Sequence, residues 1–178
     1  MVEPWLRGTL TEFEAVPRQI LHALELASED IEQWCGTLSD SEMEARPFWI
    51  APVGFHLRHI ARSLDRLLTY AEGEQLSSAQ LALIATELSA SPDVSAVLTE
   101  VRQAIVSATE RIRRIQVRSY DETRFVGRKR LPTTVAGLLV HCAEHTQRHV
   151  GQAITTAKVV VAFRAERTAS DSLDLPFR

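Results

Sequence analysis

Leu138-Leu-Val-His-Cys-Ala-Glu-His-Thr-Gln-Arg-His-Val-Gly-Gln152 is the stretch of sequence that decides both the fold and the chemistry of this chain. Its histidines, His141, His145 and His149, are spaced at i, i+4 and i+8. Residues four apart lie one above the other on a helix, so two such imidazoles can converge on one metal ion. The outer two lie about 12 Å apart along the axis, at about 1.5 Å per residue, so one ion cannot bind all three. The metal pair is therefore either His141 with His145 or His145 with His149.

Helical periodicity distinguishes the two pairs. The apolar face of this helix centres near four residues, Val135, Leu139, Cys142 and Ala153. His149 lies nearest to that face and His141 lies farthest from it. The pair His145 and His149 is therefore better placed to point into the protein. We expect His141 to lie at the surface or behind the ligands.

A second histidine cluster lies on a predicted helix from Pro52 to Glu72. Its apolar stripe comprises Val53, Leu57, Ile60, Leu64, Leu67 and Leu68. His56 lies nearer to this stripe than His59, so periodicity alone favours His56 as the third ligand. Histidine pairs on helices can also be surface residues, but two clusters that both flank inward stripes favour a metal site. His22, alone on its helix, is interpreted as an ordinary, partly exposed side chain.

The chain upstream of the last helix is also mainly helical. A first helix is predicted over Glu14–Cys35, and a short helical or turn segment over Ser39–Met43. A shorter helix is predicted over Leu76–Ala90. Ser91-Pro92-Asp93 then looks like the start of a third long helix, which reaches about Val117.

One segment departs from the helical pattern. Asp121–Thr134 carries Gly127 between apolar and basic residues, and we interpret it as a small hairpin or tight loop. Thr133 or Thr134 is expected to cap the last helix. Four long amphipathic segments with almost no strand signal predict an all-α four-helix bundle, formed as a single domain over residues 1–178.

Composition narrows the function classes. The 178 residues are 45% hydrophobic and carry a formal net charge of −3, so no global positive field favours binding to nucleic acid. Cys35 and Cys142 are far apart, which favours a reducing compartment. Met1–Gly8 lacks the pattern of a secretory signal, and the apolar tract Lys158–Phe163 is too short to cross a bilayer. We therefore expect a cytoplasmic protein without a membrane or nucleic-acid partner.

Two segments resemble the DinB-like, or YfiT-like, superfamily of four-helix metalloproteins. They are Val53-Gly-Phe-His-Leu-Arg-His-Ile-Ala61 and the stretch Leu138–Gln152 quoted above. The resemblance implies that the metal ligands are His59, His145 and His149. It overrules the periodicity preference for His56, because the family pattern has a ligand histidine followed by an apolar residue. Family members often carry a further histidine where this chain has Arg148.

Family members with known activity look like metal-dependent transferases or isomerases that use a low-molecular-weight thiol, and others are hydrolases. The resemblance thus implies a divalent metal, for which Zn or Ni is preferred with all-nitrogen ligation, and a small-molecule substrate. The favoured reaction is thiol transfer to a small electrophile, with metal-activated water as the hydrolytic alternative. The family is also consistent with a homodimer.

Basic residues beside the histidines admit two interpretations. Arg58, Arg62 and Arg66 repeat at i+4, which is typical of a solvated basic edge. Alternatively, Arg58, with Arg148, could contact a carboxylate on the thiol or substrate. Cys142 lies on the apolar face and is interpreted as a core residue, because nothing nearby would activate its thiol.

Two rival functions remain. His141-Cys-Ala-Glu-His145 matches H-x-x-E-H, the signature of inverted zinc metallopeptidases, in which Glu144 would be the general base. The outward position of His141 argues against it. A metal-stabilised bundle could also be a non-enzymatic binding or stress-response module. A closed fourth coordination position would favour that role, and an open position would favour catalysis.

Overall fold

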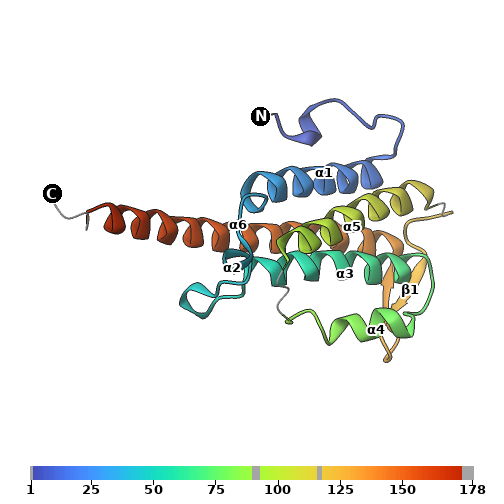
Figure 1. Cartoon of the computed structure of the whole chain (residues 1–178). Coiled ribbons are helices and arrows are strands. Elements are labelled where there is room, and N and C mark those ends of the chain that lie inside the picture. The colour runs from blue at the N-terminus through green and yellow to red at the C-terminus, as the bar shows by residue number, and fades with distance from the viewer. Residues whose placement is uncertain (1, 90–92, 116–117, 174–178) are drawn as a thin grey trace.

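Four long helices lie side by side in the computed structural model, which describes the backbone of residues 2–89, 93–115 and 118–173 and side chains to residue 166. They are α1 (Ala15–Cys35), α3 (Val53–Ala71), α5 (Val94–Arg114) and α6 (Val135–Leu173), as Figure 1 shows. Helices α1 and α3 each pack against both α5 and α6. The predicted all-α architecture is therefore confirmed.

Short elements connect the long helices. They are the 3₁₀ turns η1 (Pro4–Leu6) and η2 (Pro47–Trp49), the helices α2 (Asp40–Met43) and α4 (Ser78–Ile84), and the strands β1 (Thr123–Val126) and β2 (Leu131–Thr134). The two strands pair antiparallel with Thr123 opposite Thr134. Gly127 takes a φ of +70° between them, which a glycine adopts without steric strain. The predicted hairpin before the last helix is thus confirmed.

Helix ends follow from particular side chains. The Asp93 carboxylate accepts hydrogen bonds from two backbone N–H groups in the first turn of α5. Gly73 follows α3 with a φ of +89°, a conformation in which the chain leaves a helix readily when the residue is glycine. The Thr134 hydroxyl accepts a 3.0 Å hydrogen bond from the N–H of Gly137, so Thr134 caps α6 as predicted.

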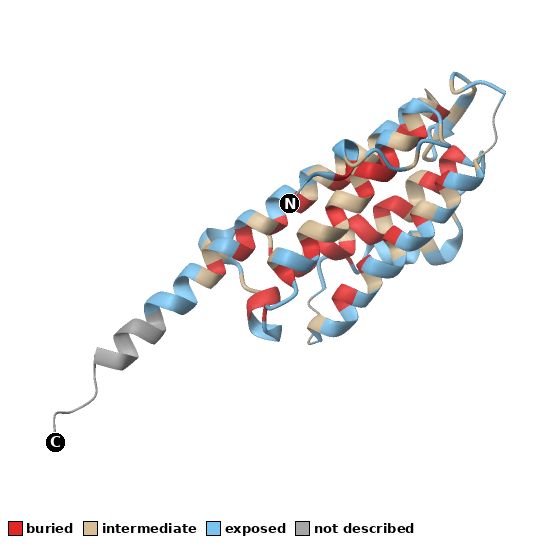
Figure 2. Cartoon of the chain, turned by 90° about the horizontal axis from the view of Figure 1, so that it is seen from above, coloured by how far each residue is buried: buried red, intermediate tan, exposed pale blue. Residues whose placement is uncertain are grey.

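The hydrophobic core lies where the four helices run together. Figure 2 shows buried residues concentrated there, whereas the described part of α6 that continues past the other helices carries mainly exposed residues. Most of the largest fully buried side chains lie on the four long helices, and they include Leu24, Ile31, Leu57, Leu64 and Leu139. At about 25 cal/mol per Å² of apolar surface, this burial is the main source of stability.

The helix predicted over Leu76–Ala90 is wrong in length. α4 spans only Ser78–Ile84, and residues 85–88 form turns. The side chains around these turns are mostly exposed, so a longer helix would have no apolar face to bury. Residue 90, the expected helix start at Ser91-Pro92 and the expected helix end at Val117 lie outside the described residues.

His22 is buried, at 4% exposure, so its interpretation as a partly exposed residue was wrong. The reason is that α1 packs against two neighbouring helices, which buries a wider face than its apolar stripe. The Nδ1 of His22 has no hydrogen-bond partner and lies 3.8 Å from the Glu25 carboxylate. Nothing in this position links His22 to the other histidines.

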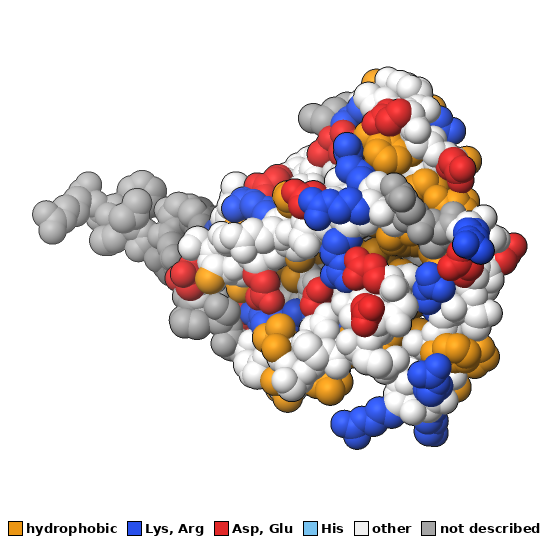
Figure 3. Space-filling view, turned by 90° about the vertical axis from the view of Figure 1, so that its right-hand side faces the viewer, with side chains coloured by type: hydrophobic (Ala, Val, Ile, Leu, Met, Phe, Trp, Pro, Cys, Tyr) orange, Lys and Arg blue, Asp and Glu red, His pale blue; other side chains and the backbone are white. Residues whose placement is uncertain are grey.

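The face of the molecule at the hairpin end carries charges of both signs (Figure 3). Viewed from the hairpin end of the bundle, Lys and Arg side chains are interspersed with Asp and Glu (Figure 3). Among the described residues, every helix is too short or too polar to cross a bilayer.

Candidate metal centre

Three histidines converge where α3 and α6 lie against each other. His59 comes from α3, and His145 and His149 come from successive turns of α6. Each offers one ring nitrogen, and these nitrogens lie within 4.8 Å of one another. All three residues are partly buried. Of the two helical pairs that spacing allowed, the structure brings His145 and His149 together with His59.

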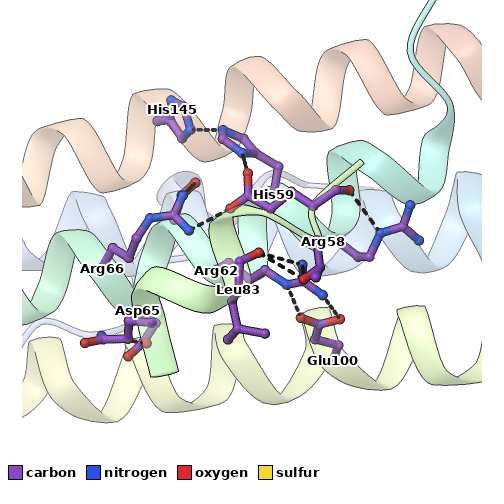
Figure 4. A network of polar contacts seen from close by, with 12 residues as sticks. Arg58, His59, Arg62, Asp65, Arg66, Leu83, Glu100 and His145 are labelled. Carbon is purple, nitrogen blue, oxygen red and sulfur yellow. Dashed lines mark hydrogen bonds and ion pairs between the residues drawn. The ribbon is translucent and has the colours of Figure 1, made fainter. Parts of the chain in front are cut away.

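The distance between two of the rings fits a shared ion. The Nε2 atoms of His59 and His145 are 2.9 Å apart (Figure 4). Two nitrogens bound to one ion at about 2.0–2.1 Å are about 2.9 Å apart at a right angle and about 3.4 Å apart at the tetrahedral angle. The third ring, that of His149, offers a nitrogen within 4.8 Å of the other two. The residues therefore fit a divalent metal.

The other ring nitrogen of His59 is held by a carboxylate. Its Nδ1 lies 2.7 Å from Oε2 of Glu87, a buried residue in the turns after α4. An ionised carboxylate only accepts hydrogen bonds, so Nδ1 must carry the proton and Nε2 keeps its lone pair for a metal. Burial alone would raise the pKa of Glu87, but hydrogen bonds from His59 and Arg66 lower it below its usual value.

His56 lies behind one of the three histidines. It is 5% exposed, and its Nδ1 is 3.0 Å from the Nδ1 of His149. This contact engages the Nδ1 of His149, so Nε2 is its other ring nitrogen. His56 is thus the more buried residue of its pair, as periodicity predicted, yet His59 is the one that joins the group.

The buried rings are neutral at pH 7. Desolvation, followed by the positive charge of neighbouring groups, lowers the pKa of His56, His145 and His149 to about 4. Neutral imidazoles have the free lone pair that a metal requires, whereas protonated ones do not. The environment therefore keeps these rings in the uncharged form that a metal requires.

An aromatic ring covers one side of the cluster. The ring of Phe55 stacks on His59 with 5.6 Å between centroids and an interplanar angle of 19°. It also meets the edge of the His149 ring at 6.4 Å. Phe55 shields this side of the imidazoles from water and restricts their rotation.

Sequence reasoning missed Glu87. The residue is 28 positions from His59 in the chain, in a segment that was predicted to be helical. No spacing rule joins it to either histidine cluster. The local sequence gives only weak evidence for a role of Glu87, because it is a charged residue between apolar neighbours such as Ile84 and Leu88.

His141 stays outside the three-histidine group. Its Nδ1 lies 2.6 Å from Glu144, whose other oxygen accepts a 2.6 Å hydrogen bond from Arg148. The Glu144 side chain is 45% exposed, and it is engaged by these two partners instead of facing His145. The geometry that the H-x-x-E-H interpretation requires is therefore not formed.

The arginines of α3 are not a solvated edge. Arg58 is 3% exposed and pairs with Glu44 at 2.7 Å, while Arg62 pairs with Glu100 at 2.8 Å. Arg66 donates a 2.6 Å hydrogen bond to Glu87. The prediction of a basic edge in water was therefore wrong, because each guanidinium reaches a carboxylate on another element.

A cavity of about 530 Å³ adjoins His56, the residue behind His149. It lies between the start of α3 and the middle of α6, and His56 and Arg148 form part of its lining. Both guanidiniums are paired with a glutamate, but Arg148 and Glu144 pair at the surface, whereas Arg58 and Glu44 pair in the interior. Of the two arginines predicted to contact substrate, Arg148 lines this cavity and Arg58 does not.

Neither cysteine is placed to act as a nucleophile. Cys142 is fully buried, and burial raises its pKa to about 12. Burial also raises the pKa of Cys35 to about 12. Both thiols stay protonated at neutral pH, which confirms that Cys142 belongs to the core.

Fold and site together define a helical bundle with a three-histidine cluster that could hold a metal ion. A family model described as the DinB superfamily matches residues 23–153, which include both histidine clusters. The chain belongs to the DinB superfamily. No curated protein and no solved structure gives a significant match.

Proposed function

We propose that the protein is a metal-dependent enzyme whose divalent ion is held by His59, His145 and His149. The observation that carries the proposal is the convergence of these three imidazoles from two helices. Within the described part of the chain, no Cys, Asp, Glu or fourth His joins the group. Three protein ligands are typical of catalytic sites, which keep a position open, whereas structural sites are usually closed by four.

The proposed reaction is transfer of a small thiol to a small electrophile. A bound divalent ion, Zn or Ni by the chemistry of the donor set, lowers the pKa of a coordinated thiol or water and so supplies a nucleophile at neutral pH. The chain's own thiols are buried and protonated, so the sulfur must come from an external thiol. Membership of the DinB superfamily supports this class of chemistry.

The surrounding residues would orient the ligands and the substrate. Glu87 and His56 fix the rings of His59 and His149 from behind, and Phe55 keeps water from one side. Arg148 offers a guanidinium at the cavity, where it would bind a carboxylate of the thiol or the substrate. We place the protein in the cytoplasm, where thiols stay reduced, as a homodimer that acts on a small molecule.

Titration of cobalt-substituted protein with thiols tests the proposal. Addition of cysteine, N-acetylcysteine or glutathione to the Co²⁺ protein should produce sulfur-to-metal charge-transfer absorption. The His149→Ala variant, treated identically, should show no such band. If no thiol changes the spectrum while the metal-loaded protein hydrolyses esters or amides, the hydrolytic alternative replaces thiol transfer.

A further inference from the structure

Three arginines on successive turns of α3 hold the segment that comprises the end of α4 and the turns after it. The Arg58 Nε donates to the backbone carbonyl of Glu87 at 3.3 Å, and Arg62 donates to the carbonyl of Leu83 at 3.1 Å. Arg66 donates to Oε1 of Glu87 at 2.6 Å. Figure 4 shows these side chains reaching from α3 toward the same segment. Polar contacts therefore attach it to α3.

Apolar burial cannot explain how this segment is held. In residues 81–89, all of which the structure describes, Glu87 alone is buried, and its large apolar neighbours Leu81, Leu83, Ile84 and Leu88 are exposed. A segment that packed for stability would show the reverse pattern. The arrangement instead places one carboxylate in the interior, beside His59.

The two oxygens of that carboxylate have different partners. Oε1 accepts from Arg66, and Oε2 accepts from the Nδ1–H of His59. The Arg66 guanidinium can only donate, so its 2.6 Å contact requires an acceptor atom on Glu87. The remaining oxygen is thereby directed to His59 as an acceptor.

We infer that Glu87 and Arg66 are positioning residues that fix the proton of His59 on Nδ1, so that Nε2 is the metal-binding atom. The inference rests on the proposed metal site. It adds residues to that site that the histidine spacing does not contain. It also gives each arginine of α3 a role, since Arg66 orients the carboxylate while Arg58 and Arg62 hold the backbone that carries it.

The substitution Glu87→Gln reverses the hydrogen bond while keeping the side chain's shape. Arg66 still takes the single carbonyl oxygen, so the NH₂ group must face His59, whose Nδ1 must then accept. The proton of His59 moves to Nε2, which cannot then bind a metal. Removing Arg66 as well frees the amide to turn, so Glu87→Gln combined with Arg66→Met should restore the original arrangement.

Two measurements test the inference. Long-range ¹H–¹⁵N NMR of the metal-free protein at pH 8 should show His59 protonated on Nδ1 in the wild type and on Nε2 in Glu87→Gln. Competition with a chelator should show Zn²⁺ affinity about 10–100-fold weaker in Glu87→Gln. The double variant should again be protonated mainly on Nδ1 of His59 and should recover most of the Zn²⁺ affinity. Glu144→Gln, which changes an exposed carboxylate that also lies between a histidine and an arginine, should leave both unchanged.

Several results would overturn the inference. One is a wild-type His59 protonated on Nε2, which needs no variant to detect. A second is a Glu87→Gln variant in which the tautomer of His59 and the Zn²⁺ affinity are unchanged. A third is a double variant that binds Zn²⁺ more weakly than Glu87→Gln alone, which is the result expected if Glu87 and Arg66 only stabilise the fold. If the wild type binds no Zn²⁺, the proposed function fails, and the tautomer measurement still decides this inference.

Discussion

Glu87 and Glu144 each lie between a histidine and an arginine, but Glu87 is buried and Glu144 is exposed. Glu144 bonds His141 and Arg148 on its own helix, three and four residues away, and its side chain is 45% exposed. Glu87 bonds two residues of another helix, and its side chain is 9% exposed. Water competes with the first set of contacts and is excluded from the second, so only the buried carboxylate can fix a histidine ring firmly.

The comparison shows that a local motif need not mark the functional contact. H-x-x-E-H places Glu144 beside His141 because any helix brings residues three apart together. The contact that prepares His59 for a metal is made across 28 residues by the fold. Matched substitutions in the region of His141 and in the three-histidine cluster can therefore confirm or contradict the assignment of His59, His145 and His149 as metal ligands.

The largest expected effect separates the histidines of α6. His149→Ala should abolish stoichiometric metal binding, because it removes one of three ligands from the buried group. His141→Ala, which removes the partner of Glu144, should retain one ion per chain. Elemental analysis of untagged, gel-filtered protein measures both. Loss of the metal in His141→Ala with retention in His149→Ala would restore the H-x-x-E-H interpretation.

A smaller difference is expected between the histidines of α3. His59→Ala should lose metal affinity far more severely than His56→Ala, because His56 contacts the ion's ligand His149 instead of joining the group. For His56→Ala the loss should be about 10-fold, typical of a partner behind a ligand. Parallel titrations against a competing chelator test this. A greater loss in His56→Ala would contradict the assignment of His59.

The smallest expected effect concerns stability against pH in the metal-free protein. His56, His145 and His149 have a pKa of about 4 when folded, against 6.5 for an unperturbed histidine. The unfolded chain therefore binds more protons than the folded one between these values, so stability is full above pH 6.5 and declines as the pH falls toward 4. Urea unfolding midpoints should decrease over this range.

The same comparison supplies the controls for the pH series. His149→Ala should weaken the pH dependence, because it removes one buried ring with a depressed pKa. His141→Ala should change the dependence less, because it removes only a minor cause of the lowered pKa of His145. A midpoint that stays constant or rises as the pH falls from 6.5 to 4 would show that the rings are not kept neutral by burial.

Much of the fold could be predicted from the sequence because its main signals are local. The stripe at Leu57 and Leu64 and the cap at Thr134 depend on residues within a few turns, so they identified the long helices. The turns after Ile84 could not be predicted. Their conformation depends on arginines of another helix, and no local pattern encodes that contact.

The candidate site shows the same division. Spacing left two possible pairs, periodicity favoured His145 with His149, and it correctly made His56 more buried than His59. Burial, however, does not measure which ring faces the partner helix, so the choice of His59 needed the resemblance to the family. Glu87 and the burial of His22 depend on tertiary packing, which the sequence pattern does not contain.

The most direct test of the central claim is an anomalous difference map from crystals of untagged, metal-loaded protein, collected at the metal's absorption edge. The account predicts one peak per chain, about 2.0–2.1 Å from nitrogens of His59, His145 and His149, with Glu87 still bonded to the Nδ1 of His59. A peak bound by His141 or His56 in place of these ligands, or no peak at the three histidines, would contradict it.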